Sequence, residues 1–345
     1  MQPKLKRVYL PKIRTVVVLG VFAALVVLVT KAALWSMRIM AETGLTPITV
    51  ARLALDTGTP LKSTDNRTNL LVLGIGGGTH PGADLTDTML VVSLDLGRRT
   101  MAMISIPRDI WSDTLQDKIN SAYHYGEEKS REAGKTGGGL VLSKAIVEEV
   151  IGMPIHYSLV IDFSGFRDMI DLVGGVDVDV ATAFTDPEFP VAGKEDDDCQ
   201  GDPKFRCRYQ ALHFDAGRQL MDGERALMYA RSRHAEGEEG SDFARSRRQQ
   251  DVLVALKGKL SHPSSWLPPT RTIQLLSVLD RATDTDMNIG EFLTIGKAIA
   301  KTKESATISV VDELVSPPVW LYGRYMLVPA ESYESLHGYI KEKLQ

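Results

Sequence analysis

The chain has 345 residues, of which 43% are hydrophobic, and this suffices for one large domain or two small ones. Its net charge is −4, although its first 14 residues carry five basic side chains and no acidic one, so the remaining chain is strongly acidic. An acidic body excludes the broad basic field on which nucleic-acid binding depends, and we expect no nucleic-acid partner.

The N-terminal segment predicts one transmembrane helix at residues 15–35. Residues 15–30 carry no charged side chain, and extension past Lys31 to Trp35 gives about the 20 residues that span a bilayer. The basic tail, residues 1–14, precedes this span, which predicts a single-pass protein of the cytoplasmic membrane with its N-terminus inside. A cleaved signal peptide is the alternative, but the apolar core is long for one.

The remaining chain predicts a polar stalk at residues 36–65 and an extracytoplasmic domain at residues 66–345. Short apolar runs bounded by turn residues predict strands at 70–73, 89–94, 101–106, 157–161 and 176–180. Helical spacing predicts three helices. They cover residues 140–151, residues 164–173 with Ser164 as the N-terminal cap, and residues 270–302. Residues 181–210 look like a long irregular loop. This alternation predicts an α/β fold with a mixed sheet between helical layers.

The chain has two cysteines, Cys199 and Cys207, eight positions apart. In an extracytoplasmic domain such a pair predicts a disulfide that closes the short loop between them. Two cysteines without a nearby histidine pair make a poor zinc site.

The first candidate ligand-binding segment is the glycine-rich turn at residues 74–87, GIGGGTHPGADLTD. Glycines let the backbone approach an anion closely, and Asp87, just before a strand, can hold Mg²⁺ beside a pyrophosphate. The segment is neither a Walker loop, which needs Gly-Lys-Ser/Thr, nor a dinucleotide fingerprint, which needs a helix next. A turn with a capping aspartate is the alternative interpretation.

Two further segments place polar side chains near the predicted strands. Arg108 follows the third strand and Pro107, and strand ends are where α/β folds bind ligands. A surface ion pair between Arg108 and Asp109 is the alternative. Lys118 and Asn120, in the run KINSAYHYG, can donate to phosphate or sugar oxygens.

Five arginines gather in the run YARSRHAEGEEGSDFARSRRQQD. Its second half predicts a helix capped by Ser241 or Asp242, with a buried apolar face at Val252, Leu253, Leu256 and Leu260. Continued backwards by fours from Leu253, that face reaches Gln249 and Arg245. An inward-facing arginine needs an anion because it keeps its proton, and no acid lies on this face near Arg245. The expected anion is a phosphate ligand, to which a guanidinium donates two parallel hydrogen bonds.

The other arginines of the run allow a simpler interpretation. A solvated basic face, paired with nearby acidic residues, suits Arg247 and Arg248 equally well. Those acids are Glu236, Glu238, Glu239 and Asp242. Arg231 and Arg233 alternate in YARSRH at the end of a strand or helix, and alone they are a weak signal.

In type and order, these segments resemble the LytR–CpsA–Psr family of cell-wall glycopolymer ligases. The ordered motifs are NLLVLG, LTDTM, SIPRD, KINSAY, IDFSGF with LVGGVDVDV, MDGERAL with YARSRH, and DF-x-R-x-x-RQ. The resemblance covers roughly residues 66–260. It implies a three-layer α/β/α sandwich.

The resemblance also implies roles for matching residues. Its catalytic set is Arg108 on the pyrophosphate, with Arg231, Arg233, Arg245 and Gln249. Lys118, Asn120 and Arg248 are assigned to substrate binding, and Asp87 to a Mg²⁺ ion. Gly76 stands where the family often has Asp, so one metal carboxylate is missing. Either Asp84 or His80 replaces it, or Asp87 and phosphate oxygens hold the metal alone.

The implied function is that of a membrane-anchored phosphotransferase. It moves a glycan-phosphate from a polyprenyl-pyrophosphate carrier to a peptidoglycan hydroxyl, so the expected partners are that lipid-linked glycan, peptidoglycan and membrane lipid. One alternative is a phosphohydrolase that uses water as the acceptor. Another is a non-enzymatic lipid-binding or regulatory protein of the envelope.

Overall fold

The structure, a computed structural model, describes residues 30, 31, 37, 58–78, 82–194, 196–262, 269–302 and 304–345. The chain divides into two compact units, Met1–Gly58 and Thr59–Gln345, and every element named below belongs to the second. The predicted span at 15–35 lies outside the described residues except for Thr30 and Lys31. Within the described ranges, no helix combines the length and apolar character that a membrane crossing requires.

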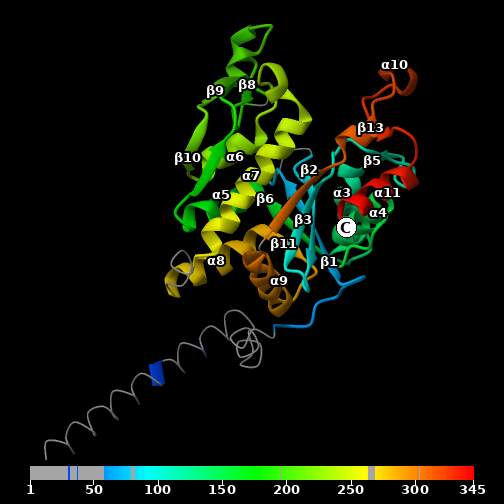
Figure 1. Cartoon of the computed structure of the whole chain (residues 1–345). Helices are drawn as coiled ribbons and strands as arrows, with labels where there is room; N and C mark the ends of the chain where they lie inside the picture. Colours follow the sequence, from blue (N-terminus) through cyan, green and yellow to red (C-terminus); the bar gives the residue numbers. More distant parts are fainter. Residues whose placement is uncertain are drawn as a thin grey trace, which may run out of the picture. The chain divides into compact units, whose positions relative to one another are not determined.

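The second unit is built on a six-stranded mixed sheet in the order β11-β6-β1-β2-β3-β12 (Figure 1). Its strands are β1 (Arg67–Ile75), β2 (Thr86–Asp95), β3 (Thr100–Ser105), β6 (Tyr157–Asp162), β11 (Thr283–Thr285) and β12 (Glu304–Ser309). β1 pairs antiparallel with β2 and parallel with β6, while β3 pairs antiparallel with β2 and parallel with β12. The predicted hairpin between the second and third strands is confirmed.

Helices cover both faces of this sheet because its central strands are apolar on both sides. Leu71 and Leu73 of β1 join a core with α3 (Ala122–Glu132), α4 (Gly138–Ile151) and α11 (Tyr333–Lys343). Leu70, one position along, points the other way into a core with α9 (Ile289–Lys301). The predicted mixed sheet between helical layers is therefore confirmed.

A third core lies beside the sheet, at the left of Figure 1. It joins α5 (Phe163–Leu172), α6 (Gly223–Arg231) and α7 (Asp242–Leu260) to two antiparallel strand pairs. The pairs are β7 (Val176–Val180) with β10 (Gly217–Met221), and β8 (Phe184–Pro190) with β9 (Tyr209–Phe214). The remaining elements include α8 (Pro269–Ala282), α10 (Val319–Tyr322), β4 (Trp111–Ser112), β5 (Asp117–Lys118), β13 (Leu314–Val315) and β14 (Val328–Pro329).

Three local predictions were wrong. Residues 181–210, which were expected to form a long irregular loop, contain β8 and the start of β9. Residues 270–302 form two helices, because β11 intervenes and Asn288 begins α9 with a capping box. Asp162, rather than Ser164, caps α5 by accepting a hydrogen bond from the Gly165 amide, 2.7 Å away.

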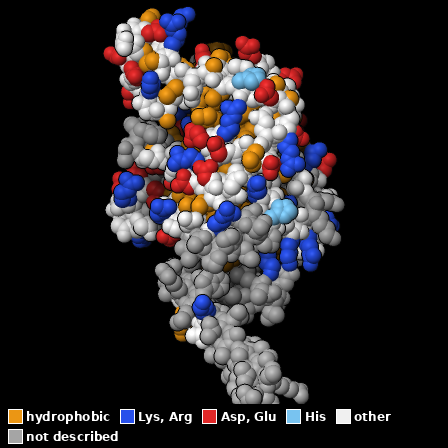
Figure 2. Space-filling view, turned by 90° about the vertical axis from the view of Figure 1, so that its left-hand side faces the viewer, with side chains coloured by type: hydrophobic (Ala, Val, Ile, Leu, Met, Phe, Trp, Pro, Cys, Tyr) orange, Lys and Arg blue, Asp and Glu red, His pale blue; other side chains and the backbone are white. Residues whose placement is uncertain are grey.

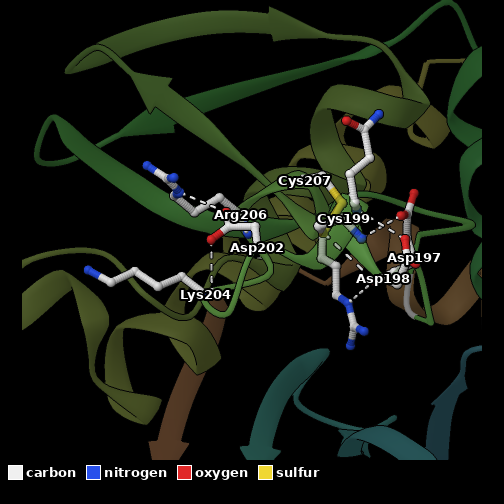
Figure 3. The surroundings of a disulfide bond; sticks show 9 residues. Asp197, Asp198, Cys199, Asp202, Lys204, Arg206 and Cys207 are labelled. Carbon is white, nitrogen blue, oxygen red and sulfur yellow. Dashed lines mark hydrogen bonds and ion pairs between the residues drawn. A yellow bond between two sulfur atoms is a disulfide. The ribbon is translucent and has the colours of Figure 1, made fainter.

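The turn between β8 and β9 carries a disulfide (Figure 3). Cys199 and Cys207 are joined, with their Cα atoms 5.5 Å apart. Asp197 and Asp202 order the same turn by accepting hydrogen bonds, from the Cys199 amide at 2.8 Å and from the Arg206 guanidinium at 2.9 Å. The disulfide therefore closes a loop within the turn that follows Phe189 and Pro190, two residues that line the candidate active site.

The close crossing of α3 and α4 depends on glycine, and we predict that Gly126→Ala weakens the fold. A Cβ at Gly126 would lie 2.3 Å from the carbonyl oxygen of Gly138, so the two helices would have to separate. We expect a loss of about 1–3 kcal/mol in the free energy of unfolding, measured by urea denaturation. Gly258→Ala is the control, because Gly258 lies within α7 and nothing stands within 4 Å of its added Cβ. Equal stability of the two variants would contradict the prediction.

Candidate active site

Asp87 owes its position to an irregularity in the pairing of β1 with β2. Gly74 pairs with Thr88 and Ile75 with Thr86, so Asp87 is the extra residue on its strand. Such a bulge re-aims the side chain of the unpaired residue, and bulges of this kind are common beside active sites. Gly74 suits the close pairing with Thr88, because an added Cβ would make a tight contact, 3.1 Å from the Thr88 Cβ.

Arg108 lies just beyond β3 and reaches the same carboxylate. Its guanidinium donates a hydrogen bond to Asp87 Oδ1. Its Nε is buried, lies 3.6 Å from Asp109 Oδ2, and forms no hydrogen bond among the described residues. The Arg108 carbonyl accepts a bond from the Asn120 amide at 3.3 Å, which fixes its backbone. Arg108 is therefore held beside Asp87, although it is not itself one of the residues that line the cleft described below.

The end of α6 and the loop after it bring Arg231 and Arg233 to the same place. The Arg231 guanidinium lies over the Phe163 ring, 4.7 Å from its centroid. Arg233 Nη2 is 4.0 Å from Asp87 Oδ1. The prediction that these arginines stand at the end of a strand or helix is confirmed, since α6 ends at Arg231.

A buried carboxylate, Asp186 of β8, holds this loop. It accepts hydrogen bonds from the Ser232 hydroxyl at 2.7 Å and from the amides of Arg233 and His234 at 3.0 and 3.2 Å. Burial alone would raise the pKa of Asp186. These bonds, with a further one from the Glu188 amide, outweigh burial, and the pKa lies below its usual value.

Helix α7 contributes Arg245, which joins Arg231 and Arg233 in the lining of one cleft. Ser241 caps the helix by accepting a hydrogen bond from the Ala244 amide at 3.1 Å. Arg245 is only 9% exposed and lines the cleft together with Gln249, one turn along the helix. The helical phase read from the sequence is therefore correct for both residues.

These side chains surround a cleft of about 140 Å³. Three arginines line it against a single carboxylate, so the cleft has an excess of positive charge. Phe163, Phe189 and Pro190 add apolar surface to the same lining, and the combination suits a ligand with an anionic head. The lining residues are Asp87, Thr88, Phe163, Phe189, Pro190, Arg231, Arg233, His234, Arg245 and Gln249.

Arg248, which the resemblance assigns to substrate binding, does not line this cleft. Its side chain has no exposed surface. Its guanidinium donates to the carbonyl oxygens of Tyr229, Ser232 and Glu239 at 3.2, 2.7 and 2.9 Å, and to the Glu239 carboxylate at 3.0 Å. Arg248 thus fastens α7 to the end of α6.

Lys118 and Asn120 also lie outside the cleft lining, where they contact Asp109 and Arg108. Lys118 Nζ donates to Asp109 Oδ1 at 2.6 Å. The Asn120 carbonyl accepts a bond from the Thr86 hydroxyl at 3.1 Å, while its amide binds the Arg108 carbonyl. Both residues therefore support the segments that carry Asp87 and Arg108.

The sequence did not point to several lining residues. Phe189 and Pro190 lie in the segment that was expected to be an irregular loop. Phe163 is the first residue of a helix whose apolar residues all read as buried core positions. His234 adjoins the arginine motif but was not assigned a role. The FTDPEFP run holds two acids, Asp186 and Glu188, and the sequence alone does not tell which of them is buried.

Asp87 is the one carboxylate in the cleft lining, and it fits a single-carboxylate Mg²⁺ site. Mg²⁺ commonly takes one or two carboxylates and completes its shell with substrate phosphates and water. Asp84 instead lies 2.8 Å from His124 Nδ1, and His80 is outside the described residues. Elsewhere in the described chain, the one cluster of metal-ligating residue types is Asp197 with Cys199 and Cys207, whose sulfurs are joined to each other.

We predict that Asp186→Asn removes a pH-dependent stabilisation. A carboxylate whose pKa is lowered by folding stabilises the protein above its unfolded pKa, about 3.9, and loses that effect as the pH falls through its folded pKa. The variant should be about 1–3 kcal/mol less stable at pH 7, and the gap should shrink below about pH 4. Urea denaturation of both proteins between pH 7 and 3 measures it. A gap that stays constant over this range would contradict the role given to the Asp186 charge.

The face of the molecule drawn in Figure 2 is of mixed charge. Lys and Arg side chains are interspersed there with Asp and Glu side chains. The cleft differs in having three arginines against one carboxylate, a local excess of positive charge suited to a small, dense anion.

Comparison with known proteins places the chain in context. The model of the LytR_cpsA_psr family matches residues 48–337. Over 186 residues the chain is 34% identical to the polyisoprenyl-teichoic acid–peptidoglycan teichoic acid transferase TagV of Bacillus subtilis (strain 168), covering 52% of this chain and 40% of that protein. Over 249 residues it is 28% identical to the transferase TagU of Oceanobacillus iheyensis, covering 71% and 66%. Both matches span less than two thirds of the relative's own length.

The fold is also that of a solved relative. The crystal structure of B. subtilis TagV matches with a TM-score of 0.56 and 27% identity. The match covers 82% of this chain and 98% of that one.

Proposed function

Because this chain belongs to the LytR_cpsA_psr family, we propose that it is a membrane-anchored phosphotransferase that attaches a glycan to peptidoglycan. Its donor is a glycan carried on polyprenyl pyrophosphate, and its acceptor is a peptidoglycan hydroxyl outside the cytoplasmic membrane. The names of TagV and TagU describe transfer of a polyisoprenyl-linked polymer to peptidoglycan. The carrying observation in this chain is the convergence of Arg231, Arg233 and Arg245 on one cleft.

The reaction is a phosphoryl transfer. The acceptor oxygen bonds to the phosphorus next to the glycan, and the bond from that phosphorus to the bridging oxygen breaks. Polyprenyl phosphate leaves with that oxygen, and the acceptor hydroxyl loses its proton. Such reactions ask the protein mainly for positioning and for stabilisation of charge on the phosphate oxygens.

The cleft residues match these demands. Arg231, Arg233 and Arg245 line the space a pyrophosphate would occupy, and Arg108 pairs with Asp87 of the same lining. Gln249 adds an uncharged donor that fixes orientation. Asp87 would hold a Mg²⁺ ion, which would supply further positive charge to the phosphates.

The test is a product analysis. The full chain in nanodiscs is incubated with a short-chain polyprenyl-pyrophosphoryl glycan, Mg²⁺ and peptidoglycan oligomers, and products are identified by mass spectrometry. We expect a sugar joined to the oligomer by a phosphodiester. Free sugar phosphate alone would show a phosphohydrolase, and bound intact donor without turnover would show a binding protein. Either of these results would overturn the proposal.

A further inference from the structure

The lining of the cleft offers two side chains that can take up the proton which the acceptor hydroxyl loses. Asp87 carries a carboxylate, and His234 carries an imidazole. The other polar residues of the lining are three arginines, Gln249 and Thr88, and none of these side chains accepts a proton near neutral pH. The proton acceptor within the cleft lining is therefore Asp87 or His234.

Asp87 is engaged with positive charge. Its Oδ1 accepts a hydrogen bond from the Arg108 guanidinium and lies 4.0 Å from Arg233 Nη2. In the proposed function the same carboxylate holds Mg²⁺. An aspartate ordinarily takes up a proton only near about pH 4, and here cations occupy the oxygen atoms that would receive it. Asp87 therefore serves to hold positive charge in the cleft.

His234 combines a fixed backbone with an unengaged ring. The amides of Arg233 and His234 both donate to Asp186 Oδ2, at 3.0 and 3.2 Å, so the backbone that carries the imidazole is held in place. Among the described residues, the ring nitrogens of His234 form no hydrogen bond and no ion pair. Histidine is the side chain that ordinarily exchanges a proton between about pH 5 and 8. The imidazole is thus available to a substrate in the cleft.

His234 stands on the open side of the cleft. The residue is exposed, whereas Arg245 in the same lining is only 9% exposed. A polymeric acceptor cannot enter a cleft of about 140 Å³ and can reach it only from the open side. The acceptor hydroxyl would therefore meet His234 while the phosphates of the donor occupy the inner part beside Arg245.

The charged groups near His234 come from every element that forms the cleft. They are Asp87 of β2, Asp186 of β8, Arg231 and Arg233 at the end of α6, and Arg245 of α7. A bound pyrophosphate adds negative charge to this set. Because an anion nearby favours the charged form of an imidazole, the bound donor would stabilise the imidazolium that forms when the hydroxyl gives up its proton.

We propose that His234 is the general base of the transfer. One ring nitrogen of the neutral imidazole takes the proton of the acceptor hydroxyl as that oxygen bonds to the phosphorus next to the glycan. The bond from this phosphorus to the bridging oxygen breaks, and polyprenyl phosphate leaves with the electron pair. The imidazolium then returns the proton to solvent on its exposed side. This inference rests on the proposed function and adds the proton acceptor to it.

The test compares His234→Ala and His234→Gln with the wild type, each as the full chain in nanodiscs. At about pH 7.5 the kcat for transfer should fall at least about 100-fold in both variants, because general base catalysis typically contributes that much. The donor KM should stay close to wild type, because the three arginines remain. Free imidazole should restore part of the rate of His234→Ala, which a structural role would not allow.

The pH profile gives a second readout. In the wild type kcat should fall as the pH drops between about 8 and 5, where the imidazole becomes protonated, and this acidic limb should be absent from both variants. His213→Gln is the matched control and should keep the wild-type rate and profile. His213 lies on β9 outside the cleft lining, where its ring nitrogens meet Thr185 and Asp215.

The outcomes separate this inference from the proposed function. A wild-type kcat or an unchanged acidic limb in either variant, with transfer intact in the wild type, would overturn the role of His234 and leave the function standing. A raised donor KM without imidazole rescue would make His234 a phosphate-binding cation and would also overturn it. A wild type that releases only sugar phosphate, with the same loss and rescue in the variants, would overturn the proposed acceptor and keep His234 as a base toward water. A wild type without turnover would overturn both.

Discussion

Arg245→Ala and Arg108→Ala should each reduce transfer of the glycan-phosphate by at least about 100-fold while the protein stays folded. Arg245 lies in the wall of the cleft on the inward face of α7, and Arg108 pairs with Asp87, which belongs to the same lining. Both guanidinium groups would stabilise charge that builds on phosphate oxygens during transfer. The measurement is the initial rate of phosphodiester formation at saturating donor.

The chain supplies a control on the same helix. Arg247 is two positions from Arg245, lies outside the cleft lining, and pairs with Glu239 at 2.5 Å. Arg247→Ala should keep transfer close to wild type. Arg245→Lys retains the charge without the planar fork and should fall between Arg245→Ala and wild type. Transfer at the wild-type rate in Arg245→Ala or Arg108→Ala would contradict the proposal that these arginines stabilise charge on the phosphate oxygens.

Arg248→Met should cause the largest loss of stability of any arginine substitution in this segment. The change removes a fully buried cation and leaves three carbonyl oxygens and the Glu239 carboxylate without it. Breaking a buried pair in this way typically costs about 3–5 kcal/mol. The measurement is the free energy of unfolding from urea denaturation at pH 7.

Arg247→Met provides the comparison for stability. Its guanidinium is partly exposed and shares Glu239 with Arg248, so its loss should cost about 0–1 kcal/mol. If the two methionine variants unfold at the same urea concentration, Arg248 is not the fastener between α6 and α7 that the hydrogen bonds indicate.

Arg245 and Arg248 show how far helical phase can be taken. Residues 245, 248, 249 and 252 all fall near the inward face of α7, so periodicity identifies them as turned inward. It does not tell which faces a cleft and which is enclosed. That distinction comes from the chain before the helix, since Glu239 folds back to meet Arg248. Contacts of this kind depend on the path of a loop, which periodicity does not encode.

The central strands of the sheet could be predicted because their sequence pattern is local. β1, β2 and β3 are continuous apolar runs with a short turn between the last two, and local pattern suffices to find them. Asp186 is different, because it meets Ser232 and His234 from 46 and 48 positions away in the sequence. Its pairing partners are set by the tertiary fold. The bulge that frees Asp87 likewise depends on register between strands.

The most direct test of the proposed transfer follows a labelled phosphorus atom. The donor carries ³²P at the phosphate next to the glycan, and the full chain, Mg²⁺ and peptidoglycan oligomers are supplied. We predict that the label appears in the peptidoglycan oligomer as a phosphodiester and that unlabelled polyprenyl phosphate is released. Label that stays with the polyprenyl chain, or that appears only as free sugar phosphate, would contradict transfer of a glycan-phosphate by this protein.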